Sequence, residues 1–176
     1  MADSVRLVKL FLLVPVVGVL AACGHAPVAQ TALPVADGGP EPTPVLAALD
    51  PCALLSPQDR STAGLTALGT PKTIGGARAC DWTVPSTFGV SVTLDENAGL
   101  ANLDVSHGTR TKKKVGAHQA LQVAGPKSAA GTCAVLLGVG DSASVQVDVS
   151  NASFSDTPLA CRRAATVAGL VEPKLP

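Results

Sequence analysis

Residues 80–95 read CDWTVPSTFGVSVTLD, and this stretch decides the fold of the chain. Cys80, Trp82 and Val84 alternate with more polar residues before Pro85-Ser86-Thr87, and the alternation resumes at Phe88. Apolar side chains at every second position indicate strands with one buried face, and the three-residue break between the two runs has the length of a hairpin loop. We therefore predict two antiparallel strands here.

Three further strands are predicted downstream of this hairpin. Residues 115–123 carry an alternating pattern, and residues 143–149 alternate cleanly between valine or alanine and polar side chains. Residues 133–139 are apolar at consecutive positions, which is typical of a central strand buried on both faces. The expected sheet therefore has five strands.

Helices are predicted at both ends of the domain. Asp50-Pro51 and Ser56-Pro57 each combine a capping side chain with a proline, and Asp59 completes a pattern resembling a capping box. These signals predict two short helical turns that end near Gly64. Thr157-Pro158 begins a final amphipathic helix that runs to about Val171. We predict an α+β fold: an antiparallel five-stranded sheet with N- and C-terminal helices packed on one face.

The N-terminus has the features of an export signal. Arg6 and Lys9 precede an uncharged apolar run, residues 10–22, that is interrupted by Pro15. The run is shorter than the roughly 20 residues of a transmembrane helix, so a secretory signal peptide at residues 1–22 is predicted. The alternative, a buried helix of the domain, is disfavoured because a proline-rich segment follows.

The end of this run, Leu20-Ala21-Ala22-Cys23, resembles the lipobox of bacterial lipoproteins. The resemblance implies a diacylglyceryl thioether on Cys23 and a further amide-linked chain such as palmitate. Two or three acyl chains would anchor the protein durably to the lipid bilayer, on the outer face of the cell membrane. The alternative is ordinary cleavage after Ala-x-Ala with Cys23 as a spare thiol.

A linker and one domain are expected after the anchor. Five prolines lie between Gly24 and Ala47, a composition that favours a disordered, semi-rigid spacer over residues 23–47. Residues 48–176 are then predicted to form a single α+β domain.

Four cysteines remain besides Cys23, namely Cys52, Cys80, Cys133 and Cys161. An even number in an exported protein predicts disulfides, whereas the wide spacing and the absence of a nearby histidine argue against zinc. Pairing each helix cysteine with the neighbouring strand cysteine is favoured, giving Cys52–Cys80 and Cys133–Cys161. A helix–helix bond together with a strand–strand bond remains the alternative.

The order of the cysteine motifs along the chain resembles that of a known protein family. Asp50-Pro51-Cys52, Cys80-Asp81-Trp82, a strand cysteine and a closing-helix cysteine are together similar to a family of small actinobacterial lipoproteins, DUF3558-like, of unknown function. The resemblance implies a lipid-anchored, extracytoplasmic, two-disulfide α+β domain. It implies no activity, ligand or catalytic residue.

Composition and motifs exclude several classes of function. The 176 residues carry 13 basic and 13 acidic side chains and 2% aromatics, which argues against a nucleic-acid partner. His25 falls in the linker, His107 in a loop and His118 on the polar side of a strand, so none is expected to act as a catalytic base. The acidic pair Asp95-Glu96 is interpreted as a solvated turn rather than a metal site.

The remaining motifs indicate a binding protein. Lys112-Lys113-Lys114 is interpreted first as a solubilising strand end, with anionic lipid or wall polymer as the functional alternative. No catalytic residue, metal or cofactor is predicted, so we expect a non-enzymatic binding or accessory module that meets an envelope protein or wall polymer. The alternatives are a carrier or sensor with an apolar cavity between sheet and helix and, ranked last, an extracytoplasmic hydrolase.

Overall fold

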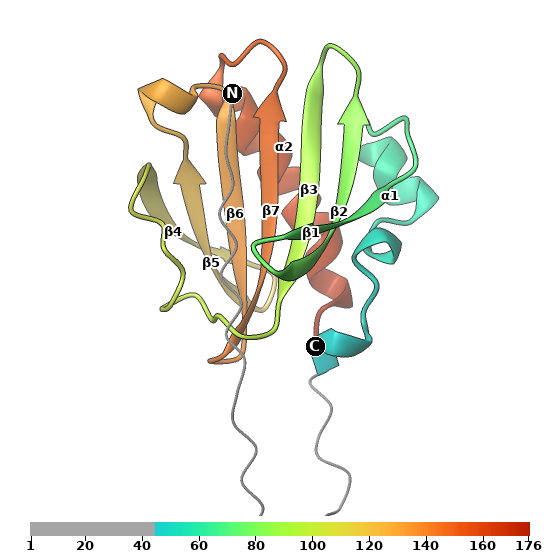
Figure 1. The fold of residues 1–176 in the computed structure, drawn as a ribbon, viewed down its shortest axis with the longest axis vertical. Coiled ribbons are helices and arrows are strands. Elements are labelled where there is room, and N and C mark those ends of the chain that lie inside the picture. Colours follow the sequence, from blue (N-terminus) through green and yellow to red (C-terminus); the bar gives the residue numbers. More distant parts are fainter. Residues whose placement is uncertain (1–44) are drawn as a thin grey trace, which may run out of the picture. The chain divides into compact units, whose positions relative to one another are not determined.

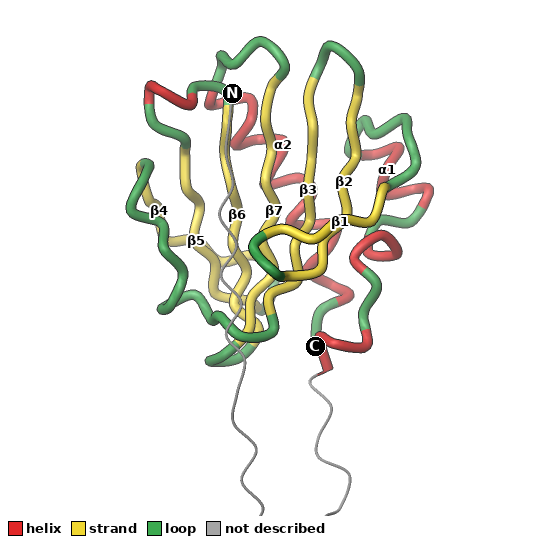
Figure 2. Tube along the Cα trace, in the orientation of Figure 1, coloured by secondary structure: helices red, strands yellow, loops and turns green. Residues whose placement is uncertain are grey.

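The computed structural model describes residues 45–176, which form a seven-stranded antiparallel sheet with helical segments on one face (Figures 1 and 2). The strand order is β1-β2-β3-β7-β6-β5-β4, so the last strand lies in the middle between two runs of hairpins. The strands are β1 (Thr70–Ile74), β2 (Ala77–Val84), β3 (Phe88–Asp95), β4 (Thr109–Val115), β5 (His118–Ala124), β6 (Thr132–Val139) and β7 (Ala143–Asn151). The helices are α1 (Pro57–Thr62) and α2 (Thr157–Val171), with short 3₁₀ helices at Val45–Ala48, Pro51–Leu54, Lys127–Ala129 and Glu172–Lys174.

The prediction of five strands is wrong, and the first missing strand is β1. All five residues of β1 are exposed, so the strand has no buried face and therefore no alternating pattern to detect. A two-residue turn, Gly75-Gly76, joins it to β2, and both glycines have positive φ (58° and 87°). Such a pair is the strongest hairpin signal in this segment of the sequence, because only glycine adopts these angles readily.

The second error concerns the strand predicted over residues 115–123. The chain reverses at Gly116-Ala117, where Gly116 has φ of 52° and Val115 pairs with His118. The predicted range therefore corresponds mainly to β5, and β4 is an additional strand that ends at Val115, before the turn. The alternating pattern does not reveal the reversal, because Ala117 in the turn continues the apolar spacing from Val115 into β5.

The expected N-terminal helix is also corrected. The segment consists of 3₁₀ turns and the six-residue α1, so α2 is the one long helix of residues 45–176. The chain is extended at Leu55 (φ −111°, ψ 102°), between the turn that begins at Pro51 and the helix that begins at Pro57. The capping box itself is confirmed, because Ser56 and Asp59 exchange both bonds.

A single core joins the helical segments to one face of the sheet. Alternate residues of β3 and β7 lie in this core, and Trp82 is fully buried in it beside Cys80, as expected. Helix α2 contacts β5, β6 and β7, whereas the turn Pro51–Leu54 contacts β1, β2 and β3. Alanines supply half of the buried positions of α2, and their small side chains allow the helix to lie close against the sheet.

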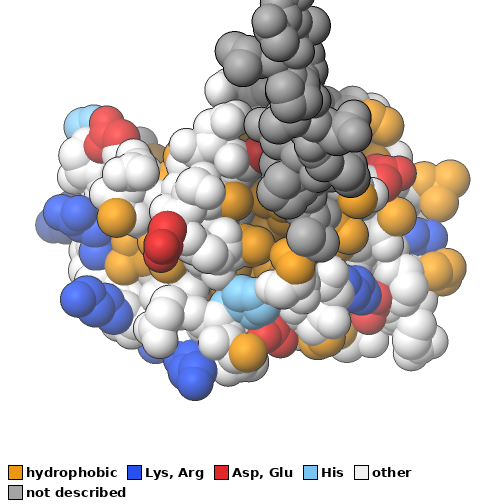
Figure 3. Space-filling model, turned by 90° about the horizontal axis from the view of Figure 1, so that it is seen from below, with side chains coloured by type: hydrophobic (Ala, Val, Ile, Leu, Met, Phe, Trp, Pro, Cys, Tyr) orange, Lys and Arg blue, Asp and Glu red, His pale blue; other side chains and the backbone are white. Residues whose placement is uncertain are grey.

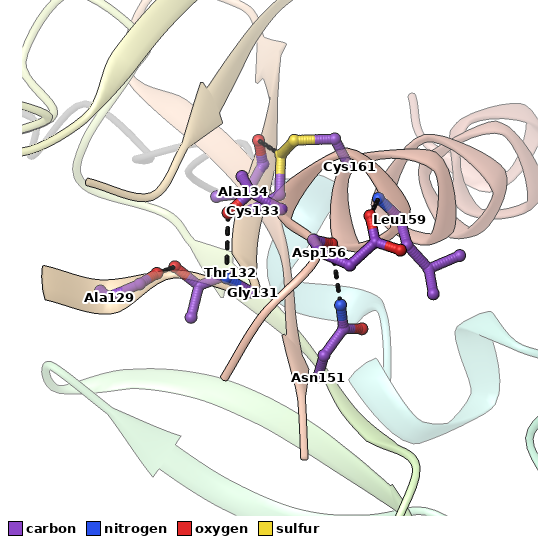
Figure 4. The surroundings of a disulfide bond; sticks show 10 residues. Ala129, Gly131, Thr132, Cys133, Ala134, Asn151, Asp156, Leu159 and Cys161 are labelled. Carbon is purple, nitrogen blue, oxygen red and sulfur yellow. Dashed lines mark hydrogen bonds between the residues drawn. A yellow bond between two sulfur atoms is a disulfide. The ribbon is translucent and has the colours of Figure 1, made fainter. Parts of the chain in front are cut away.

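Two disulfides attach the helical segments to the sheet, as predicted. They join Cys52 to Cys80 and Cys133 to Cys161, the favoured pairs, with a sequence separation of 28 in each. Figure 4 shows the second bond between β6 and the first turns of α2. Beside it, Asp156 caps the helix by accepting a bond from the Leu159 amide, and its own carbonyl accepts from buried Asn151.

Several expectations lie outside the described residues. The signal peptide at 1–22, the acylated Cys23 and most of the linker fall in residues 1–44. Leu46, which we assigned to the linker, is buried in the core. Within residues 45–176, no helix combines the length and the apolar character that crossing a bilayer requires.

Candidate functional site

The face of the sheet opposite α2 carries a cavity of about 530 Å³. Its floor comes from β2, β3, β6 and β7, and residues of the β3–β4 connection and of the β5–β6 connection rise at its sides. The β3–β4 connection contributes Leu103, Asp104, Val105 and His107. In Figure 1 this connection crosses from β3 towards β4 at the end of the sheet where β3 finishes.

Strand register places one row of side chains across the floor of the cavity. Asp81 pairs with Ser91, Ser91 with Asp148, and Asp148 with Ala134. These residues alternate with the cysteines and valines of the core, so they point to the other face. Neighbours across an antiparallel sheet lie about 4.5–5.5 Å apart, so the row is continuous.

Asp148 is the most distinctive residue of this row. It is half-buried, and Gln146, two residues earlier on β7, donates to both of its carboxylate oxygens at 2.9 and 2.8 Å. Burial raises the pKa of Asp148, and the bonds from Gln146 oppose that rise only in part. No salt bridge to Asp148 is present within residues 45–176.

The other two carboxylates of the cavity are already partnered. Lys72 on β1 lies 3.1 Å from Asp81, and the two side chains form a surface ion pair. Asp104 is exposed and accepts a bond from the amide of Ser106 at 3.0 Å, and the Ser106 side chain, together with this amide, lowers the pKa of Asp104. Asp148 therefore differs from Asp81 in having no cationic partner within residues 45–176, and from Asp104 in being half-buried.

The β3–β4 connection is fixed at its start. Asp95 accepts bonds from the amides of Asn97 and Ala98, and Ser144 donates to the Ala98 carbonyl at 2.7 Å. Gly99 lies so close to the Asp141 carbonyl that a side chain would not fit there. Asp95 thus holds a turn, and its neighbour Glu96 pairs with Arg78 at the start of β2.

The histidines have separate positions. His107 lines the cavity and is exposed. His118 does not lie on a wet face: its two ring nitrogens contact Glu172 at 2.9 Å and the Pro176 carbonyl at 3.1 Å. The bond to His118, together with one from the Ala117 amide, lowers the pKa of Glu172. His118 therefore holds the C-terminal segment against the β4–β5 hairpin.

Basic side chains gather on edge strand β4. Arg110, Lys112, Lys113 and Lys114 are all exposed, and within residues 45–176 none of them forms a salt bridge. In Figure 3 several basic side chains lie on the side of the molecule where β4 lies in Figure 1, and others lie on the opposite side. Arg110 pairs with Val123, which lines the cavity, so this basic edge begins beside the row that contains Asp148.

The cavity was missed at the level of sequence because its polar residues look like an ordinary solvated face. Gln146 and Asp148 alternate with valines, a pattern typical of a strand with one solvated face. One signal in the sequence was Leu136, an apolar residue at a position that faces away from the helix. In the structure its side chain is only 1% exposed. No group of three or more potential metal-binding side chains occurs in the part of the chain that the structure describes.

One comparison with known proteins identifies a relationship. The family model described as "Protein of unknown function (DUF3558)" matches residues 18–174. No curated protein and no solved structure matches the chain.

Proposed function

The chain belongs to the DUF3558 family of proteins of unknown function, and from this premise we propose that it is a lipid-anchored, extracytoplasmic binding module without catalytic activity. Acylation of Cys23 would fix the N-terminus in the outer face of the cell membrane. The proline-rich residues 24–44 would hold the domain away from the bilayer.

The cavity on the open face of the sheet carries the proposal of a binding role. Its volume of about 530 Å³ lies in the range of small-molecule sites, roughly 300–1,000 Å³. Its lining combines apolar side chains such as Leu103 and Val105 with a few polar groups on a rigid floor. This combination is typical of ligand sites and supplies no pair of groups positioned as nucleophile and base.

The two disulfides support an extracytoplasmic location. Disulfides persist in oxidising compartments and are rare in reducing ones. The bonds Cys52–Cys80 and Cys133–Cys161 leave Cys23 as the remaining cysteine of the chain, available for acylation.

The cavity also bears on the carrier or sensor alternative, which required an apolar space between sheet and helix. The cavity lies on the opposite face and contains carboxylates, so a purely apolar ligand fits it less well than an amphipathic one. A lipid-anchored module that binds a small ligand combines the two candidate functions, the binding module and the ligand carrier or sensor.

Two measurements test the proposal. Cells fed an alkyne analogue of palmitate should label the full chain, and the C23S variant should lose the label. Solvent extraction of the chain purified from its own membranes should release a small molecule, and Ala134→Leu, which fills the centre of the cavity, should release much less. Ala165→Leu, on the exposed side of α2, is the matched control. Equal labelling of C23S contradicts the anchor, and equal extracts from all three proteins contradict the cavity.

A further inference from the structure

We propose that the cavity on the open face binds an amphipathic organic cation, with its ammonium group at Asp148 and its hydrocarbon part over Ala134 and Val123. This inference rests on the proposed ligand-binding role of the cavity and adds the chemical class of the ligand.

The charge of the cavity selects a cation. Asp81, Asp104 and Asp148 line it, whereas no lysine or arginine is among its lining residues in the described chain. Asp81 is neutralised by Lys72, and Asp104 is exposed to solvent. Asp148 is the carboxylate on the floor whose negative charge has no counter-charge within residues 45–176. A half-buried ion of this kind is costly unless it is paired.

The hydrogen bonds of Asp148 leave room for a ligand. Gln146 uses one neutral nitrogen to contact both carboxylate oxygens. Each carboxylate oxygen can accept two bonds, so further acceptor sites remain towards the cavity. An ammonium group would supply both the donors and the charge that Gln146 cannot supply.

The apolar lining explains why the ligand needs a hydrocarbon part. Beyond Asp148 the row continues through Ala134 and Val123, and Leu103 and Val105 rise beside it from the β3–β4 connection. These surfaces would bury the methylene groups of a ligand and so strengthen its binding. An inorganic cation makes no use of them.

Two basic groups also lie near this region, so cationic and anionic ligands have to be compared. Arg110 stands at the far end of the row beyond Val123, and His107 lies at the side of the cavity. If these groups governed recognition, an anionic ligand would be preferred. The charge of the preferred ligand therefore distinguishes Asp148 from Arg110 and His107 as the recognition element.

Three probes of equal chain length test the charge: n-hexylammonium, 1-hexanol and hexanoate. The full chain, in a neutral detergent at pH 7, is titrated calorimetrically with each probe. We expect hexylammonium to bind about tenfold more tightly than hexanol, the ratio that a modest ion pair produces, and hexanoate to bind least. Uptake of a given probe by the micelles is the same for every variant, so it cancels when the variants are compared with one another.

Two variants complete the experiment. Asp148→Asn keeps the size of the side chain and should remove the preference for hexylammonium while leaving hexanol binding within about twofold. Asp141→Asn is the matched control and should retain the preference, because Asp141 is exposed and does not line the cavity.

The outcomes separate this inference from the proposed function. Hexanol or hexanoate binding as tightly as hexylammonium, or an unchanged preference in Asp148→Asn, overturns the assignment of a cation. If Ala134→Leu nevertheless abolishes that binding, the cavity stands as a ligand site and only the ligand class is wrong. If no probe binds, or if Ala134→Leu has no effect on binding, both the inference and the binding role of the cavity fail.

Discussion

The side-chain nitrogen of Gln146 lies 2.9 Å and 2.8 Å from the two carboxylate oxygens of Asp148, two residues further along β7. The two residues point to the same face because side chains alternate along a strand. A neutral amide orients the carboxylate without cancelling its charge. The open face of the sheet therefore presents an aligned, half-buried anion, a feature with a measurable effect on stability.

Asp148→Asn is expected to increase the free energy of unfolding at pH 7. Burial raises the pKa of Asp148 in the folded state, so the ionised carboxylate opposes folding above that pKa. As the pH falls through the folded pKa, wild type should recover this free energy and approach the variant. Urea denaturation between pH 7 and pH 4 measures both curves. A variant less stable than wild type at pH 7 would contradict an uncompensated charge at this position.

Removal of either disulfide is expected to lower the free energy of unfolding by about 3–4 kcal/mol. The chain-entropy model predicts equal losses for C52A/C80A and C133A/C161A, because both bonds have a sequence separation of 28. Urea denaturation of each double variant gives the loss directly, and reduced wild type should fall below both. An identical melting curve with and without reductant would show that the bonds do not support the fold.

Lys174 is expected to stabilise the domain in a pH-dependent way. Its ammonium lies 2.6 Å from Asp59, and this contact, together with bonds from Ser56, lowers the pKa of Asp59 to about 2. A lowered pKa adds stability above the unfolded value, near 4, that is lost as the pH falls towards 2. Lys174→Met should therefore cost about 1–2 kcal/mol at pH 7.

The gap between wild type and Lys174→Met should narrow as Asp59 becomes protonated near pH 2. Denaturation at pH 7, 4 and 2 follows this change. A gap of constant size would assign the stabilisation to the bond between Lys174 and the Leu54 carbonyl rather than to Asp59.

Gly116→Ala is expected to destabilise the β4–β5 hairpin and to release the C-terminal segment. Gly116 has φ of 52°, and a Cβ there would overlap the Glu172 carboxylate. The backbone cost is about 1–2 kcal/mol, and the loss of the bonds that Glu172 accepts from the Ala117 amide and from His118 adds to it.

Gly140→Ala is the matched control for this turn, because Gly140 has φ of 66° and open space around it. It should show the backbone cost alone. Equal losses of thermal stability in the two variants would show that Glu172 can move aside without cost.

The sequence predicts the core strands well because their burial is periodic. β2, β3 and β7 bury alternate residues over most of their length, and α2 has the same bounds as its helical pattern. Edge strands β1 and β4 are almost wholly exposed, so nothing in their polarity distinguishes them from loops. Their turns, Gly75-Gly76 and Gly116-Ala117, contain the missing information as positive-φ glycines rather than as a hydrophobic pattern.

The candidate site could not be predicted for a different reason. Asp81, Ser91 and Asp148 belong to three strands and become neighbours only through the register of the sheet. Because β7 lies between β3 and β6, its polar face meets residues from both halves of the domain. A period-two pattern indicates which face of a strand is polar, but it does not indicate which strand lies beside it.

The position of the ligand on the sheet is the central claim, and mapping of backbone amide shifts during a titration with n-hexylammonium tests it most directly. We expect the shifted amides to lie in β3, in β6 and β7 around Ala134 and Asp148, and in residues 103–107, whereas the amides of α2 stay unchanged. Shifts concentrated in α2, or spread evenly over the domain, would contradict a binding site on the open face.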